Sequence, residues 1–67
     1  MGWAEGRLEA LRATLLRVLE VRFPSGVPAE LVAAVSAQKD PATLDAWFDR
    51  ALTASSLDEV RSAFGLA

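Results

Sequence analysis

Proline spacing places the tightest limit on how this chain can fold. All three prolines, Pro24, Pro28 and Pro41, stand where an apolar helical pattern breaks. A proline disfavours helical geometry in the residue before it, so we expect a first helix to end at Phe23. Pro28 and Pro41 suit the first position of a helix, where a missing N–H costs nothing. The chain is therefore predicted to be a series of helices separated at these prolines.

The first predicted helix covers residues 3–23 and carries one apolar face. At about 100° per residue, its apolar side chains fall within an arc of roughly 160°. They are Leu8, Leu11, Leu15, Leu16, Val18, Leu19 and Phe23. Arg12 and Arg22 project into the same arc, and two explanations are open. Either their stems lie on apolar surface while the charged heads reach water, with Arg22 also favouring the C-terminus of its own helix, or Arg12 meets a carboxylate of a neighbouring chain.

Three shorter helices are predicted to follow, over residues 28–37, 41–53 and 57–64. Asp40 is expected to be the N-cap of the second of these. Ser56 and Glu59 predict a capping box for the last one, in which each side chain accepts from the backbone amide of the other residue. Gly65 is expected to end that helix in a left-handed conformation.

The apolar positions of all four segments predict one shared core, and no strand pattern occurs. The predicted core residues are Leu16, Leu19, Phe23, Leu31, Val35, Leu44, Trp47, Phe48, Leu52, Leu57, Val60 and Phe64. The expected fold class is all-α. It is a small four-helix domain formed by residues 1–67, with the long first helix packed on the three short ones.

The first helix is predicted to be longer than its neighbours can cover. About 21 residues at ~1.5 Å each give a length of about 30 Å, and the short helices cover roughly its C-terminal half. An uncovered apolar stripe usually marks an interface, so residues 1–11 are expected to extend from the domain and to take part in self-association as a dimer or larger homo-oligomer. The predicted interface residues are Trp3, Leu8, Leu11, Arg12, Leu15 and Val18.

Composition excludes several other classes of protein. The chain has no Cys and no His, which excludes disulfides and a Cys/His zinc site. Its net charge of −2 disfavours a nucleic-acid-binding surface. No apolar run approaches the ~20 residues of a membrane span. Glu5 and Arg7 come too early for a signal peptide, so a cytoplasmic protein without membrane contact is predicted.

No catalytic residue, cofactor or metal ion is predicted, and the chain is not expected to be an enzyme. Without His, the usual base of an acyl-transfer triad is missing, and the only lysine, Lys39, has no companion motif. Trp47 and Phe48 could stack on a ligand, although aromatic residues at helical spacing are more often core. Four aspartates could be imagined as a magnesium cluster, but capping and solvated helix surfaces explain Asp40, Asp45, Asp49 and Asp58.

Two segments resemble a known protein family. They are LLRVLEVRFPSGVPAELVAAV at residues 15–35 and LDAWFDRALTASSLDEV at residues 44–60. Both resemble the C-terminal helical region of the Rpn family, the recombination-promoting nucleases or putative transposases of the PD-(D/E)XK superfamily. The nuclease site of that superfamily needs an acid two residues before a lysine. Ala37 stands at that position before Lys39, so the resemblance implies a helical tail without nuclease activity.

The resemblance also implies a regulatory function. In this bacterial family, short products of the nuclease gene act as antitoxins. The leading hypothesis is therefore a non-catalytic module that self-associates and binds and inhibits a full-length Rpn-type nuclease, as in a toxin–antitoxin or phage-defence system. A tail cut out of the longer protein would look the same. The alternatives are a purely structural domain and a DNA-binding accessory domain, the latter using Arg7, Arg12, Arg17, Arg22 and Arg50.

Overall fold

The computed structural model describes residues 2–66, and within that range the chain forms four α-helices and no strand. The helices are α1 (Trp3–Arg22), α2 (Ala29–Ala37), α3 (Pro41–Thr53) and α4 (Leu57–Ala63). The all-α prediction is confirmed, with one long helix followed by three shorter ones. The two outermost residues of the predicted domain, 1 and 67, lie outside the described range.

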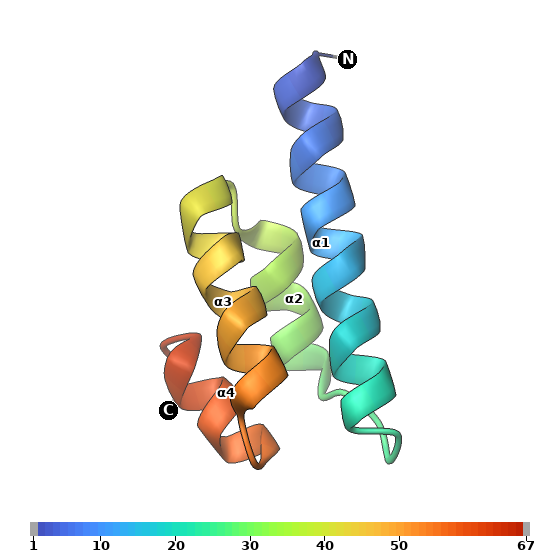
Figure 1. Ribbon diagram of the computed structural model, residues 1–67, viewed down its shortest axis with the longest axis vertical. Coiled ribbons are helices and arrows are strands. Elements are labelled where there is room, and N and C mark those ends of the chain that lie inside the picture. The colour runs from blue at the N-terminus through green and yellow to red at the C-terminus, as the bar shows by residue number, and fades with distance from the viewer. Residues whose placement is uncertain (1, 67) are drawn as a thin grey trace.

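The helices are arranged so that α1 and α3 run in the same direction while α2 runs in the opposite one (Figure 1). α1 packs mainly against α3 and to a smaller extent against α2, and α4 packs against α3. The molecule measures 35 Å along its longest axis and 21 by 20 Å across. The first turns of α1 extend beyond the other helices, as Figure 1 shows.

One apolar core joins the four helices. Its buried residues are Leu15, Leu19, Leu31, Val35, Leu44, Ala51, Ala54, Val60 and Phe64. Trp47 of α3 stacks on Phe64, with the ring centroids 4.3 Å apart and the planes 15° from parallel. This stack fixes the end of α4 against α3, because offset aromatic pairs add attraction to the area they bury.

Most of the predicted core is found in the core. Six of the predicted residues are buried, namely Leu19, Leu31, Val35, Leu44, Val60 and Phe64. Five more are partly buried and pack against them, namely Leu16, Phe23, Trp47, Phe48 and Leu57. The prediction for Leu52 is wrong, since 47% of this residue is exposed. Ala51 occupies the buried position instead, and the next residue of a helix points about 100° away from it.

The prediction that Leu15 belongs to an interface between chains is also wrong. Leu15 is 0% exposed and lies in the chain's own core. The reason is the packing of α1 against α3, which covers this part of α1 within one chain.

Arg12 and Arg22 bind the C-terminal ends of neighbouring helices, which neither sequence-based explanation anticipated. Nε and Nη2 of Arg12 donate to the carbonyl oxygen of Gln38, the C-cap of α2, at 2.9 and 2.6 Å. Nη1 of Arg22 donates to the carbonyl oxygens of Ala51 and, at 2.7 Å, Ala54 at the end of α3. Carbonyl groups at a helix C-terminus lack intrahelical partners and carry partial negative charge, so they attract a guanidinium.

Local capping signals define the ends of α3 and α4. Asp40 accepts from the amide of Ala42 at 3.3 Å and from the hydroxyl of Thr43 at 2.7 Å, which confirms it as the N-cap of α3. Ser56 accepts from the amide of Glu59 at 3.4 Å, as the capping box requires. The prediction for the second hydrogen bond of the capping box is wrong by one residue. The Glu59 carboxylate accepts from the amide of Ser55, at 2.9 Å, and not from that of Ser56.

Backbone conformation explains two further boundaries. Gly65 has φ of +78°, and its amide donates to Ser62 while that of Leu66 donates to Arg61, at 3.1 and 2.8 Å. This pair of bonds is a Schellman motif, and the predicted left-handed stop is confirmed. Pro28 is the N-cap of α2, one residue outside the predicted position. Its ψ of 144° is extended, so the helix begins at the following residue.

Replacing Asp40 with alanine is expected to lower the free energy of unfolding by about 1 kcal/mol, the usual cost of a lost N-cap. The change can be measured by urea denaturation followed by circular dichroism, at a concentration where the chain is monomeric. Asp45→Ala is the matched control, because Asp45 is an exposed residue in the second turn of α3. Equal losses in both variants would contradict the capping role of Asp40.

Candidate interaction surface

Large apolar side chains are exposed at both ends of α1. Trp3, in the part of α1 that extends beyond the other helices, is 79% exposed. The guanidinium carbon of Arg7 lies 5.7 Å from the centroid of the Trp3 ring. Near the other end, Val21 is 69% exposed. The two residues lie about five helical turns apart, so they share one face of α1.

The six predicted interface residues do not form one surface. Arg12 donates to the carbonyl oxygen of Gln38, and Leu15 is buried in the core, so both make their contacts within the chain. Leu8 and Leu11 are partly buried and pack against the core, so they are better covered than the length of α1 suggested. Val18 is also partly buried against the core. Of the six, only Trp3 is largely exposed, at 79%.

A shallow apolar groove lies between α1 and α3, and we call it the α1–α3 groove. It has a volume of about 270 Å³ and is lined by Thr14, Arg17, Val18, Val21, Arg22 and Leu52. Val21 and Leu52 were not predicted to belong to an interface. Val21 gave a signal in the sequence, because it is an apolar residue outside the arc that faces the core. Leu52 gave none, because its spacing matches the core stripe of α3.

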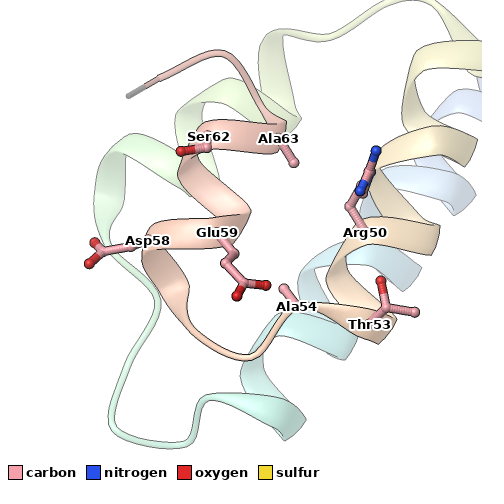
Figure 2. Close-up of a pocket in the computed structure, with 7 residues that line it drawn as sticks. All are labelled: Arg50, Thr53, Ala54, Asp58, Glu59, Ser62 and Ala63. Carbon is pink, nitrogen blue, oxygen red and sulfur yellow. The ribbon is translucent and has the colours of Figure 1, made fainter.

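A larger hollow lies between α3 and α4, and its polar side chains do not converge. Its volume is about 640 Å³, and it is lined by Arg50, Thr53, Ala54, Asp58, Glu59, Ser62 and Ala63. Figure 2 shows Asp58 and Ser62 pointing away from α3, whereas Glu59 points toward it. The Glu59 carboxylate already caps α4 through the amide of Ser55. The arrangement has the features of a capped helix end.

The acidic residues imagined as a magnesium cluster are dispersed. Asp40 caps α3, and the other three aspartates are exposed on α3 and α4. In the part of the chain that the structure describes, no three residues among His, Cys, Asp and Glu gather closely enough to hold a metal ion. None of the described helices has both the length and the apolar character needed to cross a membrane.

Two of the five arginines that the DNA-binding alternative uses are held by contacts within the chain. Arg12 and Arg22 are bound to carbonyl oxygens at the ends of α2 and α3. Arg61 of α4 lies with its Nε 3.0 Å from a carboxylate oxygen of Glu30 on α2. This contact has ion-pair distance without hydrogen-bond alignment. Arg12 and Arg22 of that set, and Arg61 in addition, thus make contacts within the chain.

Comparison with known proteins gives no further guidance on function. No family model matches the chain, and neither a curated protein nor a solved structure matches it. The resemblance to the Rpn family therefore stays a prediction.

Proposed function

We propose that this chain is a non-catalytic interaction module that self-associates through α1 and binds the matching tail of a full-length Rpn-type nuclease. By this binding it inhibits the nuclease, as an antitoxin-like short product would. The observation that carries the proposal is the exposure of large apolar side chains along the longest helix. Trp3 and Val21 lie on one face of α1, and Leu52 of α3 adjoins Val21 across the α1–α3 groove.

Domain size supports self-association. A domain of about 60 residues buries only about 60% of the surface of its unfolded chain, so its own core supplies limited stability. Burial of exposed Val and Leu side chains between two chains adds about 1.5–3 kcal/mol for each side chain that is fully covered. A partner bound to α1 would therefore stabilise the fold.

A protein partner suits the surface better than a nucleic acid. The chain has a net charge of −2, whereas binding to the phosphate backbone requires a cluster of free cations. Arg12 and Arg22 donate to backbone carbonyl groups, and the groove beside Arg22 has an apolar floor. An apolar floor with charged residues at its edges is the usual composition of a protein–protein interface.

The proposal predicts that the purified chain is a dimer or larger particle at micromolar concentration and that co-expression lowers the toxicity of the full-length nuclease. Sedimentation velocity measures the first property, and colony counts on induction measure the second. Val32→Glu is the control, because Val32 is an exposed apolar residue of α2 that does not line the α1–α3 groove; this variant should assemble and protect normally. A monomer at high micromolar concentration would contradict self-association, and undiminished toxicity would contradict inhibition.

A further inference from the structure

We infer that two copies of this chain pair across the α1–α3 groove, about a two-fold axis that runs along the groove, so that α1 of each copy lies on α3 of the other. This inference rests on the proposed self-association and assigns its surface and geometry. Three features of the groove support it: an apolar floor, edges of opposite charge, and the common direction of its two helices.

The floor of the groove is apolar and comes from both helices. Val18 and Val21 are contributed by α1, and Leu52 by α3. Val21 and Leu52 are exposed, although such side chains are stabilised by burial. Because they lie on either side of one groove, a single partner seated on it covers both.

The edges of the groove carry opposite charges. Arg17 lines the groove on the α1 side and is exposed. On α3, Asp45 and Asp49 precede Leu52 by seven and three residues, a spacing that places them beside it on the helix surface. Both aspartates are exposed, and among the described residues neither they nor Arg17 form an ion pair. The groove therefore has a basic edge on α1 and an acidic edge on α3.

The direction of the helices decides which partner fits. α1 and α3 run the same way on the two sides of the groove (Figure 1). A two-fold axis along the groove keeps each residue at its level and exchanges the two sides, so the basic edge of one copy meets the acidic edge of the other, twice. An axis across the groove would place like charges together, which is costly. A second copy of this chain is thus a complementary partner for both edges at once.

This arrangement also places the two Trp3 residues at one end of the assembly. Trp3 lies on the same face of α1 as Val21, in the part that extends beyond the other helices. In a pair with parallel axes, the extended ends of both α1 helices lie at the same end of the assembly.

Charge reversal tests the pairing. Arg17→Asp alone and Asp49→Arg alone are each expected to weaken the dimer by about tenfold or more, because each places like charges across the interface twice. An equimolar mixture of the two variants should restore dimerisation, since every pair across the mixed interface is then opposite in sign. Analytical ultracentrifugation measures the dissociation constants, and circular dichroism checks that both variants are folded. Glu9→Arg, an equally large change at an exposed position on the far side of α1, should dimerise like the wild type.

The outcomes separate this inference from the proposed function. If the wild type dimerises and both single variants dimerise equally well, or if the mixture stays monomeric, the groove pairing is overturned while self-association stands. A monomeric wild type overturns both. A monomeric chain whose binding to the nuclease tail is weakened by Val21→Glu would show that the groove takes the nuclease, and would also overturn the pairing of copies.

Discussion

Replacing Leu15 with alanine is expected to lower the free energy of unfolding by about 2–5 kcal/mol, the range for truncating a buried leucine. Leu15 is 0% exposed and lies where α1 packs on α3. Stabilities of about 0.05–0.15 kcal/mol per residue give a chain of this length about 3–10 kcal/mol in total. The variant should therefore lose much of its stability, as measured by urea denaturation followed by circular dichroism.

Val21→Ala is the control for this measurement, because it shortens an exposed apolar side chain of the same helix. At a concentration where the chain is monomeric, its effect should stay within about 0.5 kcal/mol. If Leu15→Ala kept full stability as a monomer and lost only the ability to self-associate, Leu15 would belong to the interface after all.

The double variant Arg12→Met, Arg22→Met is expected to lose about 3–6 kcal/mol. Each arginine donates two hydrogen bonds from a charged group, which contribute about 1.5–3 kcal/mol per site once the unpaired carbonyl oxygens are included. The carbonyl groups that the two arginines bind lie at the ends of different helices, α2 and α3, so the two effects should add. Thermal and urea denaturation of the single and double variants measure the sum.

Arg17→Met is the matched control, because Arg17 is an exposed arginine of the same helix and has no hydrogen-bond partner among the described residues. It should change the stability of the monomer by no more than about 0.5 kcal/mol. If Arg12→Met and Arg22→Met each lowered the free energy of unfolding by no more than about 0.5 kcal/mol, water would replace both sets of contacts at no cost, and the prediction would be wrong.

The helices could be predicted because their boundaries depend on neighbours in the sequence. Asp40 caps α3 through residues two and three positions later, and Gly65 ends α4 through a conformation that glycine adopts readily. These signals operate within one or two turns. The predicted helices accordingly match the observed ones to within one residue at each end.

The contacts between helices could not be predicted from spacing alone. Arg12 donates to a residue 26 positions away, and Arg22 to residues 29 and 32 positions away, so their partners depend on the packing of whole helices. Ala51 and Leu52 show the same limit. Both lie near the apolar stripe of α3, but the buried site faces neighbouring helices, and the smaller residue occupies it.

The candidate interface was only partly predictable for a related reason. Trp3 was found because a long first helix is visible in the sequence, and the structure places it on the extended end. Val21 and Leu52 come together only because α1 and α3 lie side by side, and the sequence of neither helix indicates which helix packs beside it. A groove made by two helices needs their tertiary arrangement.

The two arginine contacts also restrict how α1 can move. They lie ten residues, or about 15 Å, apart along the helix, and they hold it to two different neighbours. Rolling α1 about its axis, or sliding it by one turn, would break both sets of bonds together. The orientation of the outer face of α1 is therefore set when the chain folds. A partner meets a preorganised surface and loses little additional entropy in binding it.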